Sequence, residues 1–210
     1  MMICFILFHS MYNFNILSIN KFIYNLNKLY NILYMSKRID ASVWGNSAWH
    51  LLHTIGLNTK VSSLNKKDYI IFLNNFKNIL PCPNCRKNYE VKHSNFLIND
   101  ETISNKNYQK WVYNIHNMVN DSIYNTRISF NDHIKEHKQY DVKKINKFSN
   151  IVIDQLGSAP SYKELLDCKT YLKCIIKLHP KKIKNKSKKI KELEEIYEPN
   201  KLKKWFNSIK

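Results

Sequence analysis

Residues 81–85 read Pro81-Cys82-Pro83-Asn84-Cys85, with two cysteines separated by two residues. Pro83 suits the first position of a helix, because its φ is already set and its missing N–H needs no partner there. The stretch before the pair has apolar side chains at the spacing of one helix face, which fits no alternating strand. These apolar residues are Tyr69, Phe72, Leu73, Phe76, Ile79 and Leu80. The sequence therefore predicts two helices that meet at the cysteine pair.

The predicted helix start would make this pair reactive. Backbone N–H groups and the positive end of the helix dipole would lie near Cys82 and favour its thiolate form. We interpret the pair as a redox disulfide in which Cys82 is the more accessible sulfur and Cys85 its partner. A thioredoxin-like motif would need a strand before the dithiol, and the helical spacing argues against one.

A structural zinc site is the other alternative for the pair, and it would need two further ligands. The chain offers only distant ones, namely Cys168 and Cys174, or His93. We therefore expect no metal site.

Composition favours a mainly helical fold. The 210 residues include only 3 glycines and 5 prolines, which is too few for a sandwich with many tight turns. The formal charge is +18, and residues 131–210 hold 20 Lys against 10 Asp and Glu, or +10. No nucleic-acid-binding motif accompanies this charge, so we expect a solvated basic surface and no specific nucleic-acid partner. Five cysteines are too few and too scattered for a disulfide-stapled secreted domain.

Residues 1–37 are expected to form an N-terminal extension. A membrane span is not predicted, because Asn13, Asn15, Asn20 and Lys21 interrupt every apolar window of the required length. No positive region precedes the first apolar run, so a signal peptide is disfavoured too. Met35 is an alternative translation start that would remove most of this extension.

The helix predicted from Ser42, its expected N-cap, to Gly56 carries a second stripe beside its apolar one. Gly45, Trp49 and His53 recur at intervals of four residues and so share a face. We interpret this stripe as a binding surface for a flat ligand. The alternative is that Trp49 anchors the core and His53 is a buried histidine with satisfied hydrogen bonds.

A further helix is predicted to start at a cap formed by Ser104 or Asn105. Its buried stripe consists of Tyr108, Trp111, Val112, Ile115, Val119 and Ile123. His116 and Asn120 lie one turn apart on one face of this helix. Imidazole and amide groups in that arrangement are suited to the polar edges of an aromatic cofactor.

Three motifs follow one another along the chain: Trp44-Gly45-x-x-x-Trp49-x-x-x-His53, Pro81-Cys82-x-x-Cys85, and Trp111-x4-His116-Asn117-x-Val119-Asn120. In order and spacing they resemble the Erv/ALR family of FAD-linked sulfhydryl oxidases, over about residues 38–130. The resemblance implies a four-helix bundle, closed by a short fifth helix, that holds FAD beside the CxxC. It also implies a homodimer formed through the bundle.

The resemblance further implies which residues contact the flavin. Gly45 would allow close approach, and Arg127 is the nearest candidate for a basic residue that holds the cofactor. The other implied contacts are Trp49, His53, Tyr89, Trp111, His116, Asn117, Val119 and Asn120. The cysteines that staple the bundle to its termini in the family are absent here, so stability must come from helix packing and bound FAD.

Residues 131–210 are expected to form a separate, mostly helical C-terminal appendage. We predict a helix within 131–157 with an extended piece at 150–154, a second helix over 165–178, a basic run at 181–191 and an amphipathic segment at 202–206. Cys168 and Cys174 are the only other close cysteine pair, and we consider a shuttle disulfide that relays electrons to Cys82. Six residues of one regular helix span ~9 Å, whereas a disulfide needs Cα atoms within about 7 Å. The alternative is therefore that both cysteines pack the appendage.

Together these inferences predict an FAD-dependent sulfhydryl oxidase that makes disulfides in thiol-containing proteins. Cys82 would accept attack by a substrate thiolate, Cys85 would pass the electron pair to FAD, and O2 would reoxidise the flavin to give H2O2. There are two alternatives. One is a noncatalytic helical adaptor with a basic tail, and the other is a cofactor-free thiol–disulfide carrier. Some large-DNA-virus members of the family carry extra C-terminal domains, so we expect a virion or host-cytoplasm location, with the mitochondrial intermembrane space as the alternative.

Overall fold

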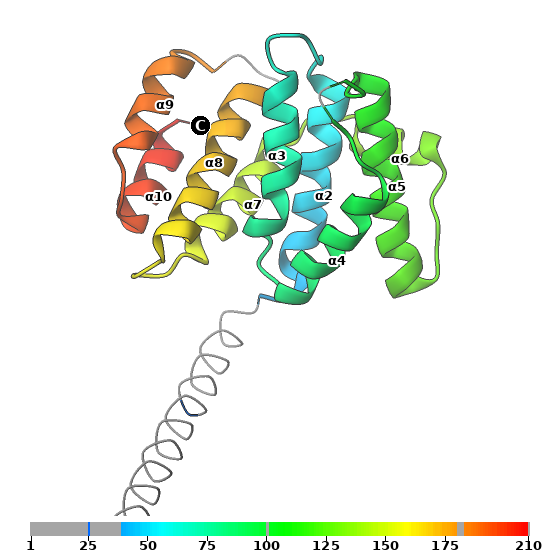
Figure 1. The fold of residues 1–210 in the computed structure, drawn as a ribbon, viewed down its shortest axis with the longest axis horizontal. Coiled ribbons are helices and arrows are strands. Elements are labelled where there is room, and N and C mark those ends of the chain that lie inside the picture. The colour runs from blue at the N-terminus through cyan, green and yellow to red at the C-terminus, as the bar shows by residue number, and fades with distance from the viewer. Residues whose placement is uncertain (1–24, 26–38, 100, 180–182, 210) are drawn as a thin grey trace, which may run out of the picture. The chain divides into compact units, whose positions relative to one another are not determined.

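The computed structural model describes residues 39–99, 101–179 and 183–209, together with Asn25. Expectations for residues 1–37, including a start at Met35, lie outside the described residues. Within the described part, all regular secondary structure of residues 39–210 is α-helical (Figure 1), as predicted. The helices are α2 (Ala41–Asn58), α3 (Lys66–Ile79), α4 (Pro83–Asn95), α5 (Asn105–Tyr124), α6 (Phe130–His137), α7 (Val142–Asp154), α8 (Tyr162–Leu178), α9 (Lys186–Glu194) and α10 (Pro199–Ser208).

The first four of these helices form the expected bundle. Helix α2 packs against α5, α3 packs against α4, and α4 also contacts α5. The short helix α6 closes the bundle by packing on α2 and α5. The chain therefore places the cysteine pair, between α3 and α4, in the same bundle as the motifs of α2 and α5.

Side-chain caps define where the bundle helices begin. Ser104 caps α5 as predicted, since its hydroxyl accepts a hydrogen bond from the Asn107 N–H at 3.2 Å. The expected cap of α2 was wrong by two residues. Asp40 is the cap, and its carboxylate accepts from the Ser42 N–H at 2.8 Å, which places Ser42 inside the first turn.

Helices α7 and α8 cover the bundle and share its core. Helix α7 packs on α2, and α8 packs on α3. Phe148 of α7 joins the layers, because its ring centroid lies 6.2 Å from Trp44, 5.7 Å from Phe76 and 6.0 Å from Tyr171. Residues 39–210 form one compact unit. The boundary expected at residue 130 therefore does not separate two compact units, because α2 and α3 bury apolar faces against α7 and α8.

The extended piece expected at residues 150–154 was wrong. This stretch is the second half of α7. Its β-branched residues suggested a strand, but Phe148, Val152 and Ile153 are buried at helical spacing. Gln155 at the end of α7 donates from Nε2 to the Ile79 carbonyl at 2.7 Å, which ties this helix to the end of α3. Tertiary packing has overridden local β-propensity here.

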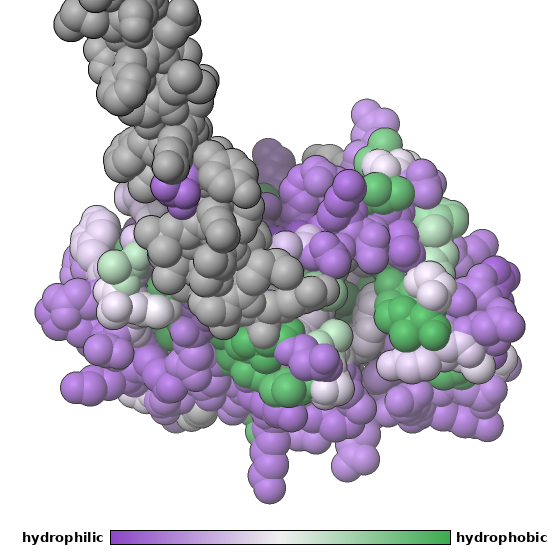
Figure 2. Space-filling view, turned by 90° about the horizontal axis from the view of Figure 1, so that it is seen from below, coloured by the Kyte–Doolittle hydropathy of each residue, from purple (hydrophilic) through white to green (hydrophobic). Residues whose placement is uncertain are grey.

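Hydrophilic side chains dominate the face of the molecule shown in Figure 2, where apolar residues form separate islands. This surface fits the excess of lysine in the sequence. Among the described residues, no helix combines the length and the apolar character that a membrane span requires.

Candidate active site and histidine cluster

The cysteine pair lies at the junction of two helices, as predicted. Cys82 is the N-cap of α4, and Pro83 occupies the first turn. Cys82 and Cys85 form a disulfide with their Cα atoms 5.1 Å apart. The Cys85 N–H also donates to Cys82 Sγ at 3.3 Å. When the disulfide is reduced, this N–H and the helix N-terminus would stabilise a thiolate on Cys82.

The expected accessibility of the two sulfurs was wrong. Cys82 is only 6% exposed and belongs to the buried core, whereas Cys85 is only partly buried. Cys85 is therefore the more accessible of the two. The reason is the turn between α3 and α4, in which Leu80 and Pro81 are buried alongside Cys82. These neighbours restrict access from solvent to Cys82.

The aromatic rings of Tyr89 and Trp111 pack against each other between α4 and α5. Tyr89 lies one turn after Cys85 on α4, and its ring meets that of Trp111 edge-on at 6.0 Å. Both polar groups have partners, because the Tyr89 hydroxyl donates to the Leu73 carbonyl at 2.9 Å and Trp111 Nε1 donates to the Phe96 carbonyl at 2.7 Å. Burial raises the pKa of Tyr89, so its hydroxyl stays protonated.

The stripe predicted on α2 meets the histidine predicted on α5. The Trp49 ring stacks on the His116 ring with centroids 4.1 Å apart and planes 10° apart. His53 Nε2 lies 3.1 Å from His116 Nδ1, a hydrogen-bond distance. Gly45, one turn before Trp49, borders open space, since a Cβ there would meet nothing within 4 Å. The structure thus brings together the side chains for which the sequence predicted a flat ligand.

The remaining residues of the α5 motif have other partners. Asn117 clamps the loop after α5, because its Nδ2 donates to the Ile128 carbonyl at 2.9 Å and its Oδ1 accepts from the Ile128 N–H at 3.0 Å. Arg127 forms an ion pair with Asp121 at 2.7 Å, and its side chain is 72% exposed. The structure therefore gives Asn117 a structural role and places Arg127 in a surface ion pair. Val119 and Asn120 are partly buried on α5.

Sequence reasoning missed two residues of this region, His133 and His137. They are the only buried residues of α6, and they lie four residues apart on one face. This His-x-x-x-His spacing was visible in the sequence and matches that of metal-ligating histidines on a helix. The family resemblance extends only to about residue 130, so it gave these two histidines no role.

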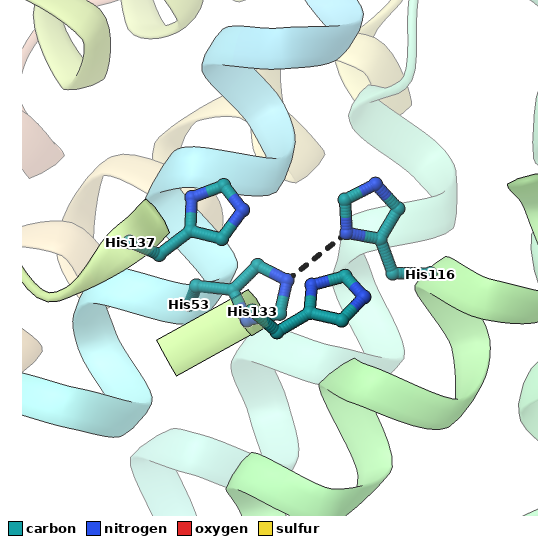
Figure 3. A group of neighbouring side chains, drawn as sticks. All are labelled: His53, His116, His133 and His137. Carbon is teal, nitrogen blue, oxygen red and sulfur yellow. Dashed lines mark hydrogen bonds between the residues drawn. The ribbon is translucent and has the colours of Figure 1, made fainter. Parts of the chain in front are cut away.

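His133 and His137 complete a cluster with His53 and His116, which we call the histidine cluster (Figure 3). The four side chains are between 1% and 8% exposed. His53 lies at the centre, with ring centroids 4.1 Å from His137, 5.1 Å from His133 and 5.3 Å from His116. One ring nitrogen from each residue lies within 4.8 Å of the others. Helices α2, α5 and α6 therefore converge on a group of imidazole donors.

Burial keeps the histidine cluster uncharged. It is the main cause that lowers the pKa of all four residues, and the neighbouring imidazoles lower the pKa of His53, His116 and His137 further. The pKa of His116 falls to about 3 and that of His137 to about 4. At neutral pH each ring therefore carries one N–H and one lone pair.

Cys168 and Cys174 do not form the shuttle disulfide that we considered. Both are free thiols on the uninterrupted helix α8, at 1% and 3% exposure. Burial raises the pKa of each thiol to about 12, which keeps it protonated and unreactive. The structure thus gives the shuttle no support and matches the alternative that both residues pack the core.

This region is similar to known proteins. Residues 46–141 match the model of the Erv1/Alr family. A probable FAD-linked sulfhydryl oxidase of Acanthamoeba polyphaga mimivirus is 34% identical over 80 residues, which are 37% of this chain. The aligned part spans 56%, about half, of that relative's length. No solved structure matches the chain.

Proposed function

We propose that this chain is an FAD-dependent sulfhydryl oxidase that makes disulfide bonds in thiol-containing proteins, because residues 46–141 match the model of the Erv1/Alr family. The observation that carries the proposal is the Cys82–Cys85 disulfide at the N-terminus of α4. It lies on the bundle that also carries Trp49, His53 and His116. The name of the mimivirus relative supports FAD as the cofactor.

The residues present fit an aromatic cofactor. The partly buried Trp49 ring offers a stacking surface, and the space beside Gly45 leaves room for close approach. Trp49, His53 and His116 would hold the group. Asn117 and Arg127 do not fit the flavin contacts expected of them. The Asn117 amide is hydrogen-bonded to the loop after α5, and the Arg127 guanidinium is paired with Asp121. When bound, FAD supplies an acceptor for the electron pair of a dithiol and passes that pair to O2, giving H2O2.

The chain's own part of the reaction is thiol–disulfide exchange. A substrate thiolate attacks Cys82 Sγ, the Cys82–Cys85 bond breaks, and Cys85 leaves as a thiolate. A second substrate thiolate attacks the mixed disulfide, which releases the oxidised substrate and leaves Cys82 reduced. We assign Cys85 to the flavin side, because it lies one turn before Tyr89 on α4, whose ring meets that of Trp111. The buried Leu80 and Pro81 restrict access to Cys82 for the first attack.

The proposed partners are protein thiols, O2 and a second copy of the chain. Helices α7 and α8 cover faces of α2 and α3, so a homodimer must form through other surfaces of the bundle. The viral relative supports a location in a virion or in host cytoplasm.

The proposal is tested by oxygen consumption. Purified full-length chain should carry a flavin absorption near ~450 nm, consume O2 with dithiothreitol and release H2O2, and Cys85→Ser should abolish all turnover. A folded, colourless protein would favour the adaptor. A colourless protein that exchanges disulfides without using O2 would favour the thiol–disulfide carrier.

A further inference from the structure

We propose that Arg86 and Gln155 are positioning residues for thiol–disulfide exchange. Together they hold the turn between α3 and α4, so that Cys82 Sγ stays at the N-terminus of α4 and leaves readily as a thiolate. The inference rests on the proposed function. It concerns the step in which the oxidised substrate is released.

The last carbonyl groups of α3 need hydrogen-bond donors from outside that helix. The final four carbonyls of an α-helix have no partner within it. Ile79 ends α3 and Leu80 is its C-cap, and the two residues are only 2% and 4% exposed. Because a buried carbonyl without a donor is unfavourable, the turn depends on groups that other elements supply.

Arg86 supplies one of these donors. It lies in the first turn of α4, directly after Cys85. Its Nε donates to the Leu80 carbonyl at 2.6 Å, and its backbone N–H donates to the Cys82 carbonyl at 3.0 Å. Arg86 thus binds one carbonyl on each side of Pro81. The backbone of Cys82 is therefore held against the first turn of α4.

Gln155 supplies the second donor, from the C-terminal end of α7. Its Nε2 donates to the Ile79 carbonyl at 2.7 Å. Asp167 of α8 holds the same end of α3, because its backbone carbonyl accepts from Asn75 Nδ2 at 2.8 Å and its Oδ1 accepts from Asn78 Nδ2 at 3.2 Å. Gln155 and Asp167 both lie after residues 46–141, the segment that matches the family model. The C-terminal helices therefore support the turn that carries Cys82.

This support fixes the surroundings of Cys82 Sγ. Cys82 is the N-cap of α4, and its sulfur accepts from the Cys85 N–H at 3.3 Å. An N–H donor and the positive end of the helix dipole both stabilise a negative charge at that position. Because Cys82 is only 6% exposed, the substrate sulfur of a mixed disulfide is the one more open to attack. Cys82 is thus placed to be the leaving group.

The release step needs only the groups already named. A second substrate thiolate attacks the substrate sulfur of the mixed disulfide, and a new bond forms between the two substrate sulfurs. The bond to Cys82 Sγ breaks, and Cys82 keeps the electron pair as a thiolate. Exchange is faster when the leaving thiol forms a more stable thiolate. Loss of either positioning hydrogen bond should therefore slow release.

The test measures release of glutathione from Cys82 in the full-length Cys85→Ser chain, which keeps the backbone N–H of residue 85. The chain is first treated with oxidised glutathione. Dithiothreitol then removes the glutathione, and peptide mass spectrometry follows the peptide that contains Cys82. Arg86→Met and Gln155→Met keep the length of the side chain but remove the donor, and each should slow release by roughly tenfold.

Two control variants accompany them. Arg86→Gln places an amide N–H at the position of Arg86 Nε and should stay within about threefold of the parent chain. Lys87→Met removes an exposed charge from the same turn of α4 and should stay within about twofold. Rescue by glutamine would attribute the effect to the hydrogen bond, because glutamine restores the donor without the charge.

Four results would overturn the proposal. They are unchanged or faster release in folded Arg86→Met and Gln155→Met chains, equal slowing in Lys87→Met, release from Arg86→Gln that is as slow as from Arg86→Met, and a Cys82 that forms no mixed disulfide. If Arg86→Met does not fold, Gln155→Met and Arg86→Gln decide the question. The release rates need no flavin. A colourless chain with the expected rates would refute the oxidase and support the positioning roles, whereas an active oxidase with unchanged rates would refute the positioning roles alone.

Discussion

His53 Nε2 lies 3.1 Å from His116 Nδ1, although 63 residues of sequence separate them. This contact joins α2 to α5. It brings together the motifs of these two helices, neither of which indicates a cofactor site by itself. Trp49 stacks on the same His116 ring, so the contact also fixes the aromatic surface of the proposed flavin site. The proposed flavin site depends on this contact.

The two cysteines of the disulfide should differ in their single variants. Cys85→Ser and Cys82→Ser should each lower turnover with dithiothreitol by more than ~100-fold, because neither retains the disulfide that exchanges with substrate. Only Cys82→Ser keeps the Cys85 thiolate. It alone should show a long-wavelength charge-transfer band with bound flavin, measured by visible absorption. Identical spectra for the two variants would refute the assigned roles.

Gly45 and Gly56 form a matched pair on α2. A Cβ at Gly56 would lie 2.6 Å from Tyr108 Cδ1, and the Tyr108 hydroxyl contacts the Leu52 carbonyl at 3.2 Å, so the ring has little freedom to move. Gly56→Ala should lower the free energy of unfolding by about 1–3 kcal/mol. Gly45→Ala meets no neighbour and should raise the stability of the flavin-free protein by roughly 0.5–1 kcal/mol.

The same pair tests the location of the flavin. If FAD occupies the space beside Gly45, Gly45→Ala should lower flavin content without loss of stability. Denaturant unfolding and the flavin-to-protein absorbance ratio measure the two effects. Normal flavin content in a stable Gly45→Ala variant would place the cofactor elsewhere.

Cys168 and Cys174 should act as packing residues. Because burial raises the pKa of each thiol to about 12, only on the order of one in ten thousand would be ionised at pH 8. Iodoacetamide should therefore leave both unmodified in the native protein and label both in denaturant, as read by mass spectrometry. Labelling should rise as pH increases toward that pKa.

Replacing Cys168 and Cys174 with Ser tests the shuttle directly. Oxidation of dithiothreitol and of a reduced protein substrate should both stay within about twofold of wild type. The buried hydroxyls should cost about 1–3 kcal/mol of stability. Loss of activity toward the protein substrate alone would restore the shuttle.

Phe148 should hold the C-terminal helices and the bundle in one cooperative unit. Its side chain is fully buried between Trp44, Phe76 and Tyr171. Phe148→Ala should lower the free energy of unfolding by about 3–5 kcal/mol, whereas Tyr162→Ala, at a side chain that is 75% exposed, should change it by less than about 0.5 kcal/mol. Two separate unfolding transitions in the wild-type chain would show that α7–α10 form an independent domain.

The sequence predicted the parts of the fold that depend on local signals. Apolar spacing identified α3 and α5, and Pro83 with the cysteine pair located the start of α4. Local signals failed where tertiary packing determines the secondary structure. At residues 150–154, burial against the bundle favours a helix over the predicted extended piece. They also missed that α7 and α8 complete the core, since sequence carries no direct signal of which faces meet.

The candidate site was predictable to a similar degree. The α2 and α5 motifs have regular spacing, so Trp49, His53 and His116 were found. The accessibility of Cys82 depends on how Leu80 and Pro81 pack, and the hydrogen bonds of Asn117 depend on the path of the loop after α5. Neither can be derived from the spacing of residues in the sequence. His133 and His137 had a visible signal, but only the fold shows that their face meets His53.

Anaerobic titration with dithiothreitol tests whether electrons pass from thiols through Cys82 and Cys85 to bound FAD. In the wild-type chain the flavin absorption near ~450 nm should bleach with about one equivalent of dithiothreitol and return when air is admitted. Cys85→Ser should bind flavin and show no bleaching. Flavin that stays oxidised in the wild-type chain, or that bleaches equally in Cys85→Ser, would contradict this path of electron transfer.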